Sequence, residues 1–304
     1  MTSPGPVPRN GSPDSEPWTS RFLSANGSRF HVVEAGSGPL VLLLHGFPQF
    51  WWAWRHQLTA LARAGFRTCA LDLRGYGDSD KPPRGYDPFT LAADVAGISR
   101  ELTTDQVTVV GQGWGGYVGW AVSAAYPDIV NGLCTVGAPH PSELLHPPLS
   151  LLTRAPTRHL AAMQVPWLPE RRIMSGNYIE RHLRAWSAPG STFPSTDEGA
   201  RYRQALASWP SPHCALEYHR WLLRSRLRAD GRAFARLMRH PIRVDVLQVS
   251  GSHDPAVHPT AITRSRRHVA GSYAEAMVHG AGHFAPEERP DEFTGILLDW
   301  LVRL

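Results

Sequence analysis

Short apolar runs alternate with longer segments of mixed polarity from residue 31 onward. These runs are rich in valine and leucine and occupy 32–33, 40–44, 67–73, 107–110 and 130–136. They are apolar at successive positions, which is typical of strands buried on both faces of a sheet. Helices of crossover length fit between the later runs, at 52–64, 91–102 and 115–125. The pattern therefore predicts an α/β fold with a mostly parallel sheet flanked by helices.

The alternation stops after residue 140 and resumes at residue 244. The intervening segment contains many arginines and leucines, several prolines and no convincing strand, so we expect it to be helical. Stretches at 244–249, around 260–269 and at 273–278 then restore the alternation, and an amphipathic helix is predicted at 290–304. Because the sheet is completed on both sides of the helical segment, we expect one core domain, residues 21–140 and 241–304, interrupted by a helical cap at 141–240.

The first twenty residues differ in composition from the rest of the chain. Five prolines stand among serines and glycines, and no apolar stretch is long enough for a signal peptide. We expect residues 1–20 to form a disordered tail. Elsewhere no uninterrupted apolar run approaches the roughly 18 to 20 residues that a membrane-spanning helix needs, so we expect no stable membrane insertion.

Charge is concentrated in the middle of the chain. The formal net charge is +5, whereas residues 141–240 alone contain 15 arginines and 7 acidic residues, a net charge of +8. Solvated helix faces are the favoured interpretation, with an anionic partner as the alternative, and we expect no nucleic-acid partner. The three cysteines, Cys69, Cys134 and Cys214, lie far apart and form no CxxC pair. We therefore expect no disulfide, no metal site, no cofactor and a cytoplasmic location.

A predicted strand runs into a predicted helix through a glycine-rich turn. The turn at 111–115 has the sequence GQGWG, which matches the spacing of the G-x-nucleophile-x-G elbow. In that elbow the central side chain is exposed above the sheet, and the amide of the next residue is available to an oxyanion. The central residue is Gly113, which has no side chain to attack a substrate. The spacing predicts an elbow whose nucleophile is missing and whose oxyanion donor is the amide of Trp114.

Two further segments fit the same constellation. The apolar run at 40–44 is followed by His45, Gly46, Phe47 and Pro48. A loop in this position supplies the second backbone N–H of an oxyanion hole, here that of Phe47. Near the end of the chain, Asp254 follows one predicted strand and His283 follows the next. The elbow, the acid and the histidine thus follow one another along the chain. In catalytic triads with this order, the acid fixes the tautomer of the histidine, and the histidine acts as the general base.

Together these residues resemble the α/β-hydrolases, and within that fold the epoxide hydrolases and haloalkane dehalogenases. The resemblance covers nearly all of the chain after the tail. It rests on HGFP at 45–48, DLRGYGDSDKP at 72–82, the elbow, GSHD at 251–254 and GHFAPEERP at 282–290. It implies an eight-stranded α/β-hydrolase fold, a helical cap that closes the active site, the pair Asp254 and His283, and a small, largely apolar substrate.

The sequence departs from the family pattern at the groups that react with the substrate. The family elbow carries histidine and a nucleophilic aspartate where this chain has Gln112 and Gly113, so the covalent mechanism has lost its nucleophile. The family also uses two cap tyrosines that donate hydrogen bonds to the opening epoxide oxygen. One of these positions holds His219, unless the adjacent Tyr218 substitutes for it, and the other aligns near 162–164, where no tyrosine is found.

We expect the substrate to contact His219, Tyr218, Pro48 and His45, although a structural role is favoured for His45. His219 is a candidate proton donor, and an ordinary polar contact within the cap is an equally good interpretation.

Three functions remain open. In the first, His283, oriented by Asp254, deprotonates a water molecule held in the space left by Gly113, and hydrolysis needs no covalent intermediate. In the second, a catalytically inactive pseudo-hydrolase binds a small ligand or a partner. In the third, His283 moves a proton in a lyase or isomerase reaction. The retained acid, base and oxyanion loop favour the first. The sequence identifies neither a particular substrate nor an oligomeric state.

Overall fold

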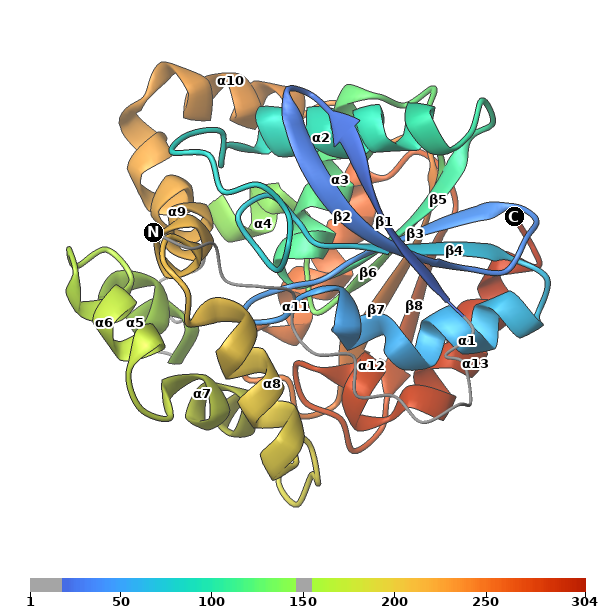
Figure 1. The fold of residues 1–304 in the computed structure, drawn as a ribbon. Coiled ribbons are helices and arrows are strands. Elements are labelled where there is room, and N and C mark those ends of the chain that lie inside the picture. The colour runs from blue at the N-terminus through green and yellow to red at the C-terminus, as the bar shows by residue number, and fades with distance from the viewer. Residues whose placement is uncertain (1–17, 146–154) are drawn as a thin grey trace.

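The computed structural model describes residues 18–145 and 155–304, in which helices flank a twisted central sheet (Figure 1). The sheet has eight strands in the order β1-β2-β4-β3-β5-β6-β7-β8. β1 pairs antiparallel with β2, β2 pairs antiparallel with β4, and the remaining pairs are parallel. The prediction of an α/β-hydrolase fold with a mostly parallel eight-stranded sheet is confirmed. The strands are β1 (Thr19–Ala25), β2 (Ser28–Ala35), β3 (Leu40–Leu44), β4 (Arg67–Leu71), β5 (Val107–Gln112), β6 (Val130–Val136), β7 (Asp245–Gly251) and β8 (Tyr273–Val278).

Helices cover both faces of the sheet (Figure 1). One face carries α2 and α3, and the other carries α1 and α13. The helices of this part of the chain are η1 (Trp51–Trp54), α1 (Arg55–Arg63), α2 (Pro88–Leu102), α3 (Trp114–Ala125), α11 (Pro259–Ser265), η4 (Arg266–His268), α12 (Ala285–Glu288) and α13 (Pro290–Leu301). None of the helices in the described residues is both long enough and apolar enough to cross a membrane.

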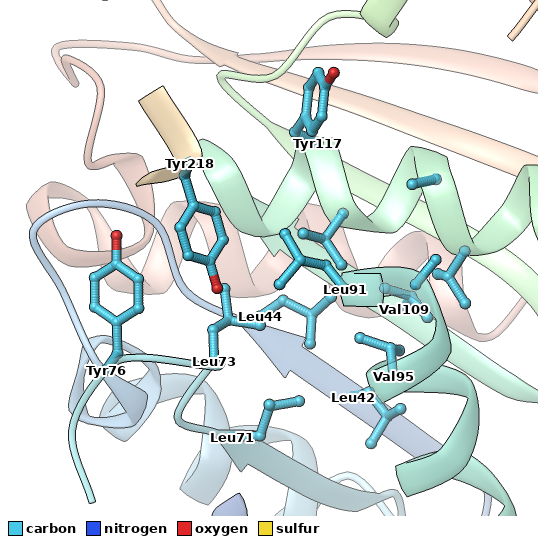
Figure 2. Close-up of a cluster of buried hydrophobic side chains, with 14 of the residues drawn as sticks. Leu42, Leu44, Leu71, Leu73, Tyr76, Leu91, Val95, Val109, Tyr117 and Tyr218 are labelled. Atoms are coloured by element: carbon cyan, nitrogen blue, oxygen red, sulfur yellow. The ribbon is translucent and has the colours of Figure 1, made fainter. Parts of the chain in front are cut away.

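The continuous apolar runs are strands whose side chains alternate between two cores. Leu42 and Leu44 of β3 belong to the core under α2, together with Leu91 (Figure 2). Leu43, between them, belongs to the core under α1, together with Leu58. All five residues are fully buried or nearly so. Burying one such leucine contributes about 1.5–3 kcal/mol, so the strand is apolar throughout because both of its faces are covered.

A second group of helices follows β6 and precedes β7. It comprises α4 (Pro141–Leu145), α5 (Ala155–Ala162), α6 (Leu168–Met174), α7 (Tyr178–Trp186), α8 (Thr196–Leu206), α9 (Ser211–Arg224), η3 (Ser225–Leu227) and α10 (Ala229–Leu237). Within the described residues this segment contains no strand, as expected, and α5 to α8 gather on one side of the molecule (Figure 1). The division of the chain into a core and a cap domain stays a prediction.

A buried ion-pair network joins α8 to the sheet-flanking helices. Arg55 of α1 pairs with Glu287 of α12 and, at 2.5 Å, with Glu198 of α8. The Tyr202 hydroxyl of α8 donates to the Glu287 carboxylate, with oxygen separations of 2.6 and 2.7 Å, and Gln49 Nε2 donates to the same carboxylate at 2.6 Å. Three donor groups, from Arg55, Tyr202 and Gln49, thus surround one buried carboxylate and tie α8 to α1 and α12.

The predicted tail falls mostly outside the described residues, which begin at Trp18. Its last two residues, Thr19 and Ser20, already belong to β1 and lie opposite Glu34 and Val33 of β2. The prediction that the tail extends to residue 20 is therefore wrong at its C-terminal end, because backbone pairing with β2 orders these residues.

Candidate active site

The elbow is a tight turn between β5 and α3. Gly113 has φ 53° and ψ −114°, a backbone conformation that residues with a side chain seldom adopt. The neighbouring Gly115 is required by close packing, since a Cβ atom there would lie 2.1 Å from the carbonyl oxygen of Leu44. The start of α3 therefore lies directly against the end of β3, as the glycine-rich sequence requires.

Asp254 and His283 come together from the loops after β7 and β8. His283 Nδ1 lies 3.0 Å from Asp254 Oδ2, and both side chains are buried. The other carboxylate oxygen, Asp254 Oδ1, accepts the N–H of Ala256 at 2.7 Å. Since a carboxylate only accepts hydrogen bonds, this contact places the imidazole proton on Nδ1 and leaves Nε2 as a lone-pair acceptor.

His283 Nε2 lies beside the space where a side chain at position 113 would begin. A Cβ atom built on Gly113 would lie 3.2 Å from His283 Nε2. The elbow, the acid and the histidine are thus arranged around the position of the missing side chain.

Two hydrogen bonds hold the His283 loop in place. The backbone N–H of His283 donates to the carbonyl of Trp186 at 2.8 Å, and the Gln112 side-chain amide donates to the carbonyl of His283 at 3.0 Å. From the sequence, Gln112 is only a departure from the family pattern. Its side chain crosses from the elbow to the loop that carries the histidine.

A small cavity of about 130 Å³ lies above Gly113 and His283. Its walls are mostly apolar and come from both the sheet-flanking part and the α4 to α10 segment. Within residues 18–145 and 155–304 they are formed by Phe47, Gly113, Trp114, Tyr117, Gly137, Ala138, Pro139, Leu144, His159, Leu160, His182, Trp186, His219, Leu222, Ala256, Val257 and His283. Phe47 and Trp114, the predicted oxyanion residues, are both present, and Trp114 opens α3, where N–H groups lack partners within the helix.

Four histidines face this cavity, of which the sequence analysis identified two. The rings of His159 and His182 lie 4.8 Å apart, and the rings of His159 and His219 lie 5.2 Å apart. Burial, together with electrostatic repulsion from the nearby His283, lowers the pKa of His159 to about 4. Burial and the neighbouring imidazoles likewise hold the pKa of His182 and His219 well below the usual range. These three imidazoles are neutral at pH 7.

Sequence reasoning missed His159 and His182. His159 lies three residues before 162–164, the stretch that aligns with the second cap tyrosine of the family. His182 lies on the inward face of α7, which also carries the buried Ile179 and Leu183, and that helical spacing was the available signal.

His219 lines the cavity, but both of its ring nitrogens are occupied. Trp114 Nε1–H donates to His219 Nε2 at 3.0 Å, and His219 Nδ1–H donates to the Ala215 carbonyl at 3.1 Å. Because Nε2 accepts the indole proton, it has none to give to a substrate. The prediction of His219 as a proton donor is therefore wrong in this geometry.

Three other predicted substrate contacts lie outside the cavity lining. The Tyr218 hydroxyl donates to the Arg74 carbonyl at 2.8 Å, and its ring packs in the core near Leu44 (Figure 2). His45 is fully buried, and its Nε2 accepts the N–H of Leu73 at 3.1 Å, which is the favoured structural role. Pro48 is also buried away from the cavity. The prediction of substrate contacts at these residues is corrected, since all three are buried outside the cavity lining.

In the part of the chain that the structure describes, no group of three or more histidine, cysteine, aspartate or glutamate side chains is arranged to hold a metal ion. The described residues of the cavity lining provide imidazoles, the Tyr117 hydroxyl and backbone amides, and the Asp254 carboxylate is hydrogen-bonded to one of these imidazoles, that of His283.

Comparison with known proteins agrees with this geometry. The family model of the alpha/beta hydrolase fold matches residues 39–290. The chain is 30% identical over 319 residues to epoxide hydrolase A of Mycobacterium tuberculosis, covering 94% of this chain and 98% of that protein. It is also 30% identical over 295 residues to the AB hydrolase superfamily protein YfhM of Bacillus subtilis, covering 92% and 97%.

Solved structures give the same result. Cfl2 from Burkholderia cenocepacia superimposes with a TM-score of 0.83 at 30% identity, covering 95% of this chain and 97% of that one. Epoxide hydrolase A from Mycobacterium thermoresistibile superimposes with a TM-score of 0.79 at 25% identity, covering 93% and 98%. With the elbow, acid and histidine arranged as described, the chain belongs to the α/β-hydrolase fold family, in its epoxide-hydrolase-like group.

Proposed function

We propose that the protein hydrolyses a small, largely apolar substrate by direct attack of a water molecule. The observation that carries the proposal is the distance of 3.2 Å between His283 Nε2 and a Cβ atom built on Gly113. A water molecule in this space lies within hydrogen-bonding reach of Nε2. It would stand where the family has its nucleophilic side chain, so no covalent intermediate is needed.

The chain's own residues supply each step. His283 takes a proton from the water as the oxygen attacks the electrophilic carbon, and Asp254 stabilises the imidazolium that forms. The backbone N–H groups of Phe47 and Trp114 receive the developing oxyanion. His283 then returns the proton to the oxygen of the leaving group. A general base contributes about 10²–10⁴-fold, and one oxyanion donor contributes about 10²–10³-fold.

The cavity favours a small substrate. Its volume is about 130 Å³, and its walls are mainly aromatic and aliphatic. An apolar cavity of about 150 Å³ accommodates benzene, which sets the scale. The named relatives include epoxide hydrolases, and an oxyanion hole suits ester hydrolysis, so monocyclic epoxides and esters are the substrate classes to test.

A second candidate is binding without turnover. It is favoured by the hydrogen bond from Trp114 to His219, which leaves no donor at the position of one family tyrosine. In this alternative the cavity keeps its shape and its apolar lining but binds a ligand without transforming it.

An activity panel separates the two functions. Styrene oxide and phenyl acetate are supplied to the wild type, to His283→Ala and to His279→Ala, an exposed histidine after the same strand that serves as the matched control. Hydrolysis that falls by at least about 10²-fold in His283→Ala alone supports the proposal. Equal rates in all three proteins contradict it, and the absence of turnover on every substrate favours the binding function.

Isotope labelling tests the direct attack. A single turnover of the epoxide in water enriched in oxygen-18 is expected to give a diol labelled in its first molecule, because the attacking oxygen comes from solvent. A carboxylate nucleophile from elsewhere in the chain would instead give an unlabelled first product, since its own oxygen is transferred. That result would overturn the water mechanism while leaving hydrolysis intact.

A further inference from the structure

Three imidazoles gather on one wall of the cavity without a carboxylate partner. His159 on α5, His182 on α7 and His219 on α9 have ring separations of 4.8 Å and 5.2 Å, whereas Asp254 is bonded to His283. Hydrophobic cavities rarely contain so many polar rings, because each buried nitrogen needs a hydrogen-bond partner. The water activation proposed above uses none of these three imidazoles.

The cluster has unused hydrogen-bonding capacity. His159 Nε2 is buried and has no hydrogen-bond partner in the described residues. The His182 ring contacts Phe47, His159 and Trp186, but within the described part of the chain it makes no hydrogen bond. His219 differs, since both of its nitrogens are bonded. His159 and His182 are therefore the two rings able to bind a ligand.

We propose that His159 and His182 form a binding site for a small carboxylate with an apolar body, and that this ligand binds together with one proton taken up from solvent. The added proton resides on the imidazole pair, and the carboxylate oxygens accept the N–H bonds of the resulting imidazolium. The cluster lacks a negative charge of its own, and the ligand supplies it. The apolar body packs against Phe47 and Trp186, which line the same cavity.

The surroundings explain why a proton enters only with an anion. The ring of Tyr178 stacks on His182. Because burial raises the pKa of Tyr178 to about 12, its hydroxyl is neutral at pH 7 and does not offset a positive charge on the imidazole. The first added proton meets no other charged imidazole in the pair. A second proton is opposed by repulsion between the two closely spaced rings. The other titratable or charged groups around the cluster are His219 and Arg220 on α9, Tyr117 on α3, and Asp254 with His283 in the loops.

No described arginine of the arginine-rich segment 141–240 lies in the cavity lining to provide the cation. Residues 141–240 carry a net charge of +8, yet within the described residues no arginine lines the cavity. Among the described lining residues, imidazoles are the groups that can neutralise a carboxylate inside the cavity. The binding site is therefore sensitive to pH, whereas a site built from arginines would not be.

Calorimetry with matched ligands tests the inference on the full chain. Phenylacetate and phenylacetamide have the same shape, and only phenylacetate is charged between pH 5.5 and 7.5, because a carboxyl group ordinarily has a pKa near 4. We expect the affinity for phenylacetate to rise by up to about tenfold for each unit of falling pH, the limit for uptake of one proton. The affinity for phenylacetamide should stay constant within about twofold. Titrations in two buffers of different ionisation enthalpy should show uptake of up to one proton with phenylacetate only.

Variants locate the proton. His159→Phe and His182→Phe should each flatten the pH dependence for phenylacetate, and His279→Phe, at an exposed position, should leave it unchanged. Equal pH profiles for the two ligands, or no binding of phenylacetate at pH 5.5, would overturn the inference. So would proton uptake that survives in both cluster variants and disappears in His283→Ala. Because only binding is measured, these outcomes are independent of whether the protein hydrolyses any substrate.

Discussion

The indole N–H of Trp114, the residue after the elbow glycine, donates a hydrogen bond to Nε2 of His219 at 3.0 Å. This bond joins the start of α3 to α9 across the wall of the cavity. It fixes the tautomer of His219 and turns a candidate proton donor into part of the cavity wall. Trp114 of the elbow thus prevents His219 from donating a proton from Nε2.

Trp114→Phe is expected to destabilise the protein by about 1–3 kcal/mol, because the buried His219 Nε2 loses its donor. The measurement is the free energy of unfolding by denaturant titration. Trp209→Phe is the matched control, since Trp209 is 56% exposed and its replacement should change stability by less than about 0.5 kcal/mol. Equal losses in the two variants would show that the Trp114 bond contributes nothing specific.

Gly113→Asp should place a carboxylate beside His283 Nε2 while straining the backbone. The φ of 53° at this position disfavours a side chain, and the strain should cost about 1–3 kcal/mol of stability. With an epoxide substrate, the expected result is an alkyl-enzyme ester detectable by intact mass. Gly113→Ala carries the same strain without the carboxylate and should give no adduct. An adduct-free, folded Gly113→Asp protein would indicate that other parts of the site have diverged as well.

His159 should make the protein less stable in acid. Burial lowers the pKa of His159 to about 4 in the folded protein, whereas the unfolded chain has the ordinary value near 6.5. Between pH 6.5 and 4 the unfolded state binds more protons, so the free energy of unfolding falls as pH falls, by up to about 1.4 kcal/mol per pH unit from this group. In His159→Phe this contribution disappears, and the variant should gain stability relative to the wild type as pH is lowered. A difference in unfolding free energy between the two proteins that stays constant from pH 6.5 to 4 would contradict this prediction.

The Glu287 network should hold α8 in place. Tyr202→Phe removes a hydroxyl that donates to the buried Glu287 carboxylate, and we expect a loss of about 1–3 kcal/mol in unfolding free energy. Glu287→Ala should cost more, about 3–5 kcal/mol, because Arg55 loses its buried partner. Tyr273→Phe, whose hydroxyl bonds a backbone carbonyl far from α8, serves as a control for proteolysis. Faster cleavage within 155–240 in the network variants alone would localise the effect, and equal cleavage in all three would refute it.

The sequence by itself predicted the parallel part of the sheet and the elbow, whereas β1 was not predicted. The run at 40–44 is typical of a strand covered on both sides, and the glycines at 111–116 are typical of a turn in which helix and strand approach closely, as the structure shows for Gly115. Asp254 and His283 were identified because each follows a predicted strand in the chain order of elbow, acid and histidine that the resemblance to α/β-hydrolases implies, and the structure brings their loops together after the paired strands β7 and β8. These features depend on local pattern and on the order of strands.

Only the tertiary structure decided the cavity wall. His159 and His182 lie on different helices, and their meeting depends on how α5 and α7 pack, which spacing in the sequence does not encode. Tyr218 and His219 are neighbours in the chain, yet one enters the core and the other the cavity, because successive residues of a helix point about 100° apart and the helix must be oriented before either direction is known. Local sequence determines which element forms, whereas side-chain chemistry in the site depends on the neighbours that packing supplies.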